Sequence, residues 1–344
     1  MTMTIPHHQA LGGALEFGAP TPLDSSLVTA APRPRPRLFH TLVGRLGNQL
    51  FQYSSVVGIA ALHGMTPCIK AALPPFDKGG GAAAFFDGIA IECNDTEPMT
   101  HVDEGGKFGT YNQFSFDGDT VLDGFLESYK YFLPNFNGTI RFKPYILADS
   151  QAFLATFLSP RRTTIGMHVR RGDVKGSDSG QSPLRDSDGL HYKMHRFSKH
   201  HYKVYDHHGH REFPGDSYFT NVLAHFRTKY SNAQFVVVSD DPTWCSTRPF
   251  FMVDDVSVVL EKHIPAVDMA ILAGCDHMAL TSGTFGWWAA YLGAGAKGGE
   301  VVYYDSVYKM EHPTNKGNVV LRDVYPDRWM ATGTTNQTTG CAEC

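Results

Sequence analysis

Short apolar segments alternate with helical segments through the second half of this 344-residue chain, and this alternation constrains the fold most strongly. Brief apolar runs bounded by loops are typical of buried strands, and apolar residues three or four positions apart are typical of helices. Strands that alternate with helices form a parallel sheet buried on both faces. The expected strands are 164–169, 235–239, 256–260, 277–281 and 300–304, and the expected helices are 216–230, 265–273 and 284–292.

The first half begins in the same way. "LFHTLV" from Leu38 predicts a strand, "GRLGNQ" a glycine-bounded loop, the residues behind it a helix, and "PCIKA" a second strand. Residues 1–37 are rich in Ala and Pro and end in "APRPRPR", a composition that cannot bury an apolar face. The predicted parts are a disordered or linker arm at 1–37, Rossmann-like domains at 38–160 and 161–330, and a flexible tail at 331–344.

Composition narrows the class of protein. Hydrophobic residues make up 42% of the chain and aromatic residues 12%, which indicates a folded globular protein. The net charge of -4 argues against a nucleic-acid binder held by bulk electrostatics, so an anionic ligand needs a local basic site. The chain shows neither an apolar run of membrane-spanning length nor a secretory signal pattern.

Cysteines and glycosylation motifs give information on the cellular compartment of the protein. Six cysteines are too few and too scattered for a disulfide-built scaffold. The CxxC at 341–344 has no second pair nearby, so a frayed tail is expected there rather than zinc. Asn94, Asn137 and Asn336 stand in Asn-x-Thr triplets and are glycosylation candidates, which favours a secretory route.

The stretch "TIGMHVRRGDV" places two arginines where a strand should end. Alternate side chains of a strand share a face, so His168 and Arg170 are expected on one face and Arg171 on the other. Ligands of open parallel sheets bind beyond the carboxyl ends of the strands, and a guanidinium group there suits a diphosphate. Arg170 is therefore predicted to bind the ligand, whereas Arg171 is expected to pair with Asp173 and hold the turn.

Two further strand ends carry polar groups. Ser282, Gly283 and Thr284 lie between a strand and a helix, where backbone N–H groups and hydroxyls can bind an anion. The alternative is that one hydroxyl simply caps the helix. Ser239 and Asp240 end another strand, and could bind ribose or base groups or cap the next turn.

Three patterns that suggest nucleotide or metal binding are set aside. The GxGxxG at 293–298 follows a helix and precedes a strand, the reverse of a dinucleotide loop. The Asp-x-Asp triplets at 117–119 and 186–188 follow no convincing buried strand, and the histidine-rich segment 191–210 lacks a metal-ligand pattern. We expect no metal site, and we expect 191–210 to form a polar loop over the ligand site.

Four motifs in order, "GRLGNQLFQYSSV", "HVRRGD", "SDDPTWC" and "LTSGTFGWWAAYL", resemble the α-1,2-fucosyltransferases of glycosyltransferase family 11. The likeness covers about residues 40–310. It implies a GT-B fold, in which two Rossmann-like domains with parallel sheets face a central cleft. It also implies metal-independent, inverting transfer of fucose from GDP-β-L-fucose to the 2-hydroxyl of a terminal β-galactose, with no cofactor.

The resemblance also implies roles for residues. Arg170 would contact the donor diphosphate, His168, Arg171 and Asp173 would shape that site, and Asn48 would lie near the cleft. The full predicted donor-binding set is Asn48, His168, Arg170, Arg171, Ser239, Asp240, Ser282, Gly283, Thr284 and Phe285. Asp173 is the first candidate for the catalytic base beside Arg170, and Glu127 and Asp123 are the alternatives.

Two rival functions and two locations stay open at this point. A protein O-fucosyltransferase shares a similar glycine loop and arginine motif, and a non-catalytic module that binds GDP-sugar or glycan would keep the cleft without a working base. The family resemblance implies the Golgi membrane or lumen. The lack of an anchor or signal in the chain makes the cytoplasm the alternative. A nucleotide sugar and a glycan are the expected partners, without nucleic acid.

Overall fold

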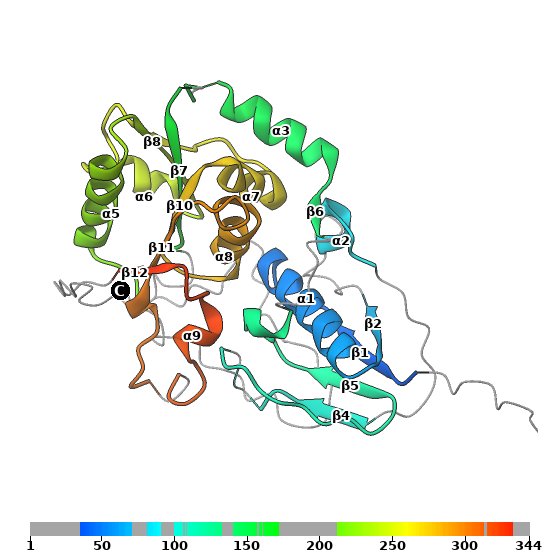
Figure 1. The fold of residues 1–344 in the computed structure, drawn as a ribbon. Helices are drawn as coiled ribbons and strands as arrows, with labels where there is room; N and C mark the ends of the chain where they lie inside the picture. Colours follow the sequence, from blue (N-terminus) through cyan, green and yellow to red (C-terminus); the bar gives the residue numbers. More distant parts are fainter. Residues whose placement is uncertain are drawn as a thin grey trace, which may run out of the picture. The chain divides into compact units, whose positions relative to one another are not determined.

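The computed structural model describes residues 35–70, 81–90, 100–105, 107, 109–132, 140–156, 158–159, 161–171, 212–312 and 315–332. They belong to Arg35–Cys344, which forms one compact unit. The described part is an α/β fold with two parallel sheets, as the sequence predicts (Figure 1). Within that part no helix is both long enough and apolar enough to cross a bilayer.

The first sheet contains four parallel strands in the order β2-β1-β5-β4. The predicted βαβ unit is present, because helix α1 joins β1 to β2. Strand β4 is missing from the prediction, since its short polar sequence Thr-His-Val-Asp lies at the exposed edge and has no apolar period. The strands are β1 Arg37–Thr41, β2 Thr66–Lys70, β4 Thr100–Asp103 and β5 Thr120–Asp123, and α1 is Leu46–Leu62.

Smaller elements follow these strands. Strands β3 and β6 form an antiparallel pair, and the helix α3 leads from β6 to the second sheet. The 3-10 turn η1 follows β5 by five residues and packs against α1. Their bounds are α2 Gly81–Phe85, β3 Phe86–Asp87, η1 Tyr129–Tyr131, β6 Arg141–Phe142 and α3 Pro144–Leu154.

The second sheet has six parallel strands in the order β12-β11-β10-β7-β8-β9. The five predicted strands are all present. They are β7 Thr163–Val169, β8 Ala233–Ser239, β9 Val256–Val258, β10 His277–Leu280 and β11 Val301–Tyr304. The sixth strand, β12 Met330–Thr332, pairs with β11 and reaches into the segment predicted as a tail.

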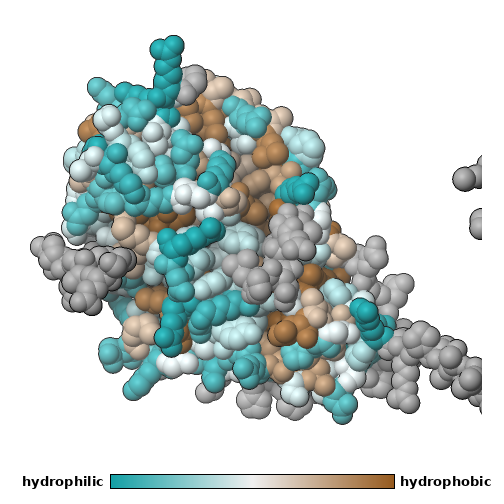
Figure 2. Space-filling model, in the orientation of Figure 1, coloured by the Kyte–Doolittle hydropathy of each residue, from teal (hydrophilic) through white to brown (hydrophobic). Residues whose placement is uncertain are grey.

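Helices cover both faces of the second sheet, which explains why its strands are apolar throughout. Figure 1 shows α5 and α6 on one face and α7 and α8 on the other. The helices are α5 Asp216–Lys229, α6 Pro242–Ser246, α7 Pro265–Gly274, α8 Thr284–Ala290 and α9 Leu321–Val324, and short turns cover Tyr291–Gly295 and Asp305–Val307. Hydrophobic residues gather over the part that carries α7 on the face shown in Figure 2. Leu260 and Ile264, which precede α7, are exposed.

Aromatic side chains from α1, η1 and α8 join the two sheets in one hydrophobic core. The Phe51 ring of α1 lies 4.5 Å from the Trp287 ring, and the Phe132 ring stacks on Trp288 at 5.6 Å. The Trp287 indole N–H donates to the Val324 carbonyl of α9 at 2.8 Å. The packed rings therefore join α1 and the residue after η1 to α8.

Candidate functional site

The carboxyl ends of β7, β8 and β10 meet at one edge of the second sheet. The chain runs from β7 to β8 and β9 on one side, and then crosses to β10, β11 and β12 on the other. In open α/β sheets, ligands bind beyond the carboxyl ends of the strands at such a reversal of strand order. The predicted ligand-binding residues that follow these three strands are therefore brought together.

Arg170 follows β7 and leans toward β10. Its backbone N–H donates to the Thr281 hydroxyl at 3.0 Å. Its side chain lies over Gly283, because a Cβ atom built there would be 3.1 Å from Arg170 Cδ and 3.4 Å from Nη1. Gly283 also has a φ of 87°, which favours glycine. Glycine at this position thus leaves room for the arginine side chain beyond the strand end.

Arg171 turns the other way, toward β8 and α6. Its backbone N–H donates to Asp240 at 2.7 Å, and its guanidinium carbon lies 4.0 Å from the Trp244 ring centre and 5.0 Å from that of Phe213. Its Nε is 3.9 Å from Asp241 Oδ2. The two arginines therefore have different neighbours, as strand alternation predicts. The predicted partner Asp173 lies outside the described residues.

His168 is buried beneath Phe285 and Gly286. Its ring lies 5.3 Å from the Phe285 ring, and a Cβ atom at Gly286 would come within 2.4 Å of its Nδ1, which has no hydrogen-bond partner. Burial lowers the pKa of His168 to about 4, with Asp240 opposing this shift and Arg170 adding to it. The imidazole is therefore neutral at physiological pH and adds no positive charge to the site.

Side chains of Ser239 and Asp241 fix the backbone where β8 ends and α6 begins. Ser239 Oγ accepts from the Asp241 N–H at 2.9 Å, and Asp241 caps α6 by accepting from the Trp244 N–H at 3.3 Å. Of the two predicted alternatives for this strand end, capping is therefore observed, and Asp241 is the capping residue. Asp240 accepts from the Arg171 backbone N–H, and its charge acts on His168.

The Ser282 to Thr284 segment contacts helix α1. Helix α8 has no side-chain cap, so the prediction of a simple capping hydroxyl is wrong. Thr284 Oγ1 instead donates to Asn48 Oδ1 at 2.5 Å, across 236 positions of sequence. Ser282 is buried at the end of β10. Asn48, which was expected near the cleft, thus joins α1 to the first residue of α8.

Glutamines that the sequence analysis missed hold the glycine loop in front of α1. The Gln52 amide accepts from the Val43 N–H at 2.7 Å and donates to the Val43 carbonyl at 3.0 Å. Gln49 donates to the Gly44 carbonyl and accepts from the Ala82 N–H, both at 2.9 Å. The sequence signal that could have revealed this role was the pair of glutamines in the first two turns of a largely apolar helix.

Gly47 lies where α1 and α8 approach most closely. A Cβ atom at Gly47 would be 2.6 Å from the Phe285 nitrogen and 2.6 Å from the Thr284 carbonyl carbon, both backbone atoms that no rotamer change can move. Gly47→Ala is therefore expected to lower the free energy of unfolding by about 2 kcal/mol, measured by thermal denaturation. Gly215→Ala is the matched control, since its nearest atom would be 3.9 Å away. Equal losses of Tm in both variants would contradict this contact.

Carboxyl groups gather at the carboxyl end of the first sheet. Asp123 ends β5, and its Oδ2 lies 3.3 Å from His101 Nδ1. Glu127 is buried four residues later, and Glu104, which follows β4, is also buried. Glu104 was not predicted, because nothing in the sequence around it marks a buried acid. Two of the three base candidates thus lie on this edge, while Asp173 lies outside the described residues.

The patterns that were set aside have structural explanations where the structure describes them. Asp119 forms an ion pair with Arg37 at 2.6 Å, which lowers the pKa of the Asp119 carboxyl. Gly293 packs against α7, where a Cβ atom would be 2.5 Å from Ala273 Cα. No group of three or more potential metal-ligating residues occurs in the described part. The predictions outside that part concern Asn94, Asn137, Asn336, residues 186–188, 191–210 and 341–344.

Comparison with known proteins gives relatives for the chain as a whole. Residues 212–319 match the family model "Glycosyl transferase family 11". Galactoside 2-alpha-L-fucosyltransferase Sec1 of Mus musculus is 27% identical over 299 residues, which cover 81% of this chain and 70% of that protein. Galactoside alpha-(1,2)-fucosyltransferase 1 of Homo sapiens is 26% identical over 275 residues, which cover 76% and 65%.

The solved structures with similar folds include the α-1,6-fucosyltransferase NodZ co-crystallised with GDP. It has a TM-score of 0.48 and 14% identity, and the match covers 80% of this chain and 96% of that one. The four motifs at strand ends and the sequence relatives agree on the family. Residues 212–319 match the family 11 glycosyltransferase model, and the chain is similar in sequence to galactoside α-1,2-fucosyltransferases over about three quarters of its length.

Proposed function

We propose that the protein transfers L-fucose from GDP-β-L-fucose to the 2-hydroxyl of a terminal β-galactose, with inversion and without a metal. Homology to galactoside α-1,2-fucosyltransferases supports the reaction and the acceptor. The observation that carries the proposal is the position of Arg170. It follows the central strand β7 at the reversal of strand order, and its side chain lies over Gly283.

The leaving group of this reaction is GDP, whose phosphate charge grows as the sugar departs. A preorganised cation aimed at that charge stabilises the transition state more than the ground state. Arg170 supplies it, because His168 is neutral and Arg171 is stacked on Trp244. Asp240 and Ser239, at the neighbouring strand end, are the candidates for binding the nucleoside part of the donor.

A base has to accept the proton of the galactose hydroxyl as it attacks the sugar. Among the described candidates we assign this role to Glu127. It is buried beyond the carboxyl end of the first sheet, four residues after Asp123. A carboxylate at such a place can accept that proton as a general base. Asp123 is more exposed and lies beside His101, and Asp173 stays a sequence-based candidate.

A secretory-pathway location fits this reaction. Cys68 of β2 is disulfide-bonded, whereas Cys245 and Cys275 are free and buried. Disulfides persist in oxidising compartments and are rare in the cytosol. We therefore favour the Golgi over the cytoplasm among the two predicted locations.

A panel of acceptors tests the proposed function. The purified protein, given GDP-fucose, is expected to fucosylate lactose and lacto-N-biose and to leave folded protein domains with acceptor serines or threonines unmodified. Product linkage is read by NMR or by α-1,2-specific fucosidase digestion. Transfer to the protein acceptors alone would favour protein O-fucosylation, and tight GDP binding without any transfer would favour a non-catalytic module.

A further inference from the structure

The turn after β5 has an unusual backbone. Leu126 has a φ of 54° and is the sole non-glycine residue with a positive φ in the described part of the chain. Gly124, two residues earlier, has a φ of 149°. Residues held in sparsely populated conformations persist only where their surroundings enforce them, and they cluster at functional sites. The contacts that enforce this turn therefore bear on Glu127, which follows it directly.

Glu104 is the side chain that enforces the turn. Its Oε2 accepts from the Phe125 N–H at 2.9 Å and from the Leu126 N–H at 3.1 Å. A Cβ atom at Gly124 would be 2.5 Å from the same oxygen. From the other side, Ser55 of α1 donates to the Leu126 carbonyl at 2.9 Å. The turn is thus fixed through its backbone on both sides.

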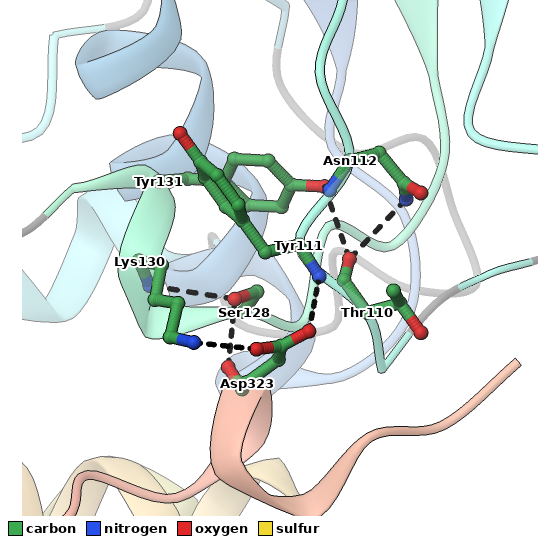
Figure 3. A network of polar contacts seen from close by, with 7 residues as sticks. All are labelled: Thr110, Tyr111, Asn112, Ser128, Lys130, Tyr131 and Asp323. Carbon is green, nitrogen blue, oxygen red and sulfur yellow. Dashed lines mark hydrogen bonds and ion pairs between the residues drawn. The ribbon is translucent and has the colours of Figure 1, made fainter.

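A second anchor follows Glu127. Ser128 Oγ donates to the Asp323 carbonyl at 2.7 Å, and Lys130 Nζ forms an ion pair with Asp323 Oδ1 at 2.6 Å (Figure 3). Asp323 Oδ2 also accepts from the Tyr111 N–H at 3.0 Å. Asp323 belongs to α9 and so comes from the far end of the chain. Glu127 therefore lies between two anchored points of the backbone.

We propose that Glu104 is a positioning residue of the acceptor side, whose buried carboxyl group clamps the turn Gly124–Leu126 and thereby places Glu127. The inference rests on the proposed function, in which Glu127 is the base. Asp323 holds the following residues, so that the base cannot turn away from the strand edge.

The protonation of Glu104 fits this role. Burial raises the pKa of Glu104 to about 8, the charges of Glu127 and Asp103 add to this shift, and the bonds from the Leu126 and Phe125 N–H groups oppose it. Burial raises the pKa of Tyr131 in η1, and the charge of Glu104 adds to this shift. At neutral pH Glu104 is then a neutral acid, which holds the turn without adding a negative charge beside Glu127.

Two substitutions at Glu104 test the proposal. Glutamine resembles the protonated acid and keeps an oxygen for both backbone N–H groups, whereas leucine removes that oxygen. Glu104→Leu is expected to lower kcat for a β-galactoside at least tenfold and to speed hydrogen exchange of the Phe125 and Leu126 amides. Glu104→Gln is expected to keep both within threefold of wild type. GDP affinity, measured by calorimetry, should change less than twofold in either variant.

The outcomes separate this inference from the proposed function. A folded, GDP-binding Glu104→Leu protein with wild-type kcat and wild-type exchange would overturn the clamp. A Glu104→Gln variant as inactive as Glu127→Gln would overturn it too, by making Glu104 part of proton transfer. If the wild type transfers fucose to no galactoside, the proposed function fails, and amide exchange still reports whether Glu104 holds the turn. Should Glu104→Leu not fold, the glutamine variant decides alone.

Discussion

Arg170→Ala is expected to lower the affinity for GDP by about 100-fold, close to 2.7 kcal/mol, the size of losing charge-assisted bonds to a diphosphate. The guanidinium lies over Gly283 beyond β7, at the crevice where strand order reverses. Its loss leaves the phosphates without their main positive partner, because His168 is neutral. Isothermal calorimetry with GDP measures the effect. Affinity within threefold of wild type would remove Arg170 from the donor site.

Arg171 supplies the matched control in the adjacent position. Arg171→Lys loses the stacking of a planar guanidinium on Trp244 and Phe213, so it is expected to lower Tm. Arg170→Lys is expected to lower GDP affinity about tenfold with little change in Tm, since a lysine keeps the charge but not the fork of donors. Equal losses of GDP affinity in the two lysine variants would mean that both guanidinium groups reach the diphosphate.

Glu127→Gln is expected to lower kcat for fucose transfer by a factor of about 100 or more, the usual contribution of a general base. The amide has the same shape as the carboxyl group but cannot accept the galactose proton. Because the proposed donor site lies at the edge of the other sheet, the KM for GDP-fucose and the affinity for GDP should stay near wild type. Steady-state kinetics with lactose as acceptor separate these quantities.

Asp123→Asn and Asp173→Asn are the controls for this assignment. Asp123 lies on the same edge, but its carboxylate is partly exposed and contacts His101, so its loss is expected to cost less than tenfold in kcat. A loss in Asp173→Asn that exceeds the loss in Glu127→Gln would move the base to the other half of the chain.

The sheet could be predicted from the sequence where strands are apolar and buried. β7, β8 and β10 have long runs of buried residues, whereas β4 and β12 are short edge strands whose few residues carry no pattern. The separation of Arg170 from Arg171 also followed from alternation along a strand. The sequence did not show that Arg170 leans toward β10 and Arg171 toward β8, because the neighbours of β7 depend on the strand order of the whole sheet.

Contacts between distant segments could not be predicted. The local sequence around Thr284 predicts a helix cap, yet the Thr284 hydroxyl donates to Asn48 of helix α1. Glu104 and Asp323 look like surface acids in the sequence, yet both are buried. Glu104 holds the turn that precedes Glu127, and Asp323 holds Ser128, which follows Glu127. Such roles arise only when segments far apart in the sequence pack together, and no spacing within a single motif encodes them.

Transfer of fucose in the presence of EDTA tests the central claim most directly. The protein, freed of metal and incubated with GDP-fucose and lactose, is expected to release GDP and form the α-1,2-fucosylated product at the same rate with or without added manganese. In this account Arg170 neutralises the leaving phosphates, so no cation is required. Product formation that stops in EDTA and returns with manganese, or donor hydrolysis without any fucosylated galactoside, would contradict the account.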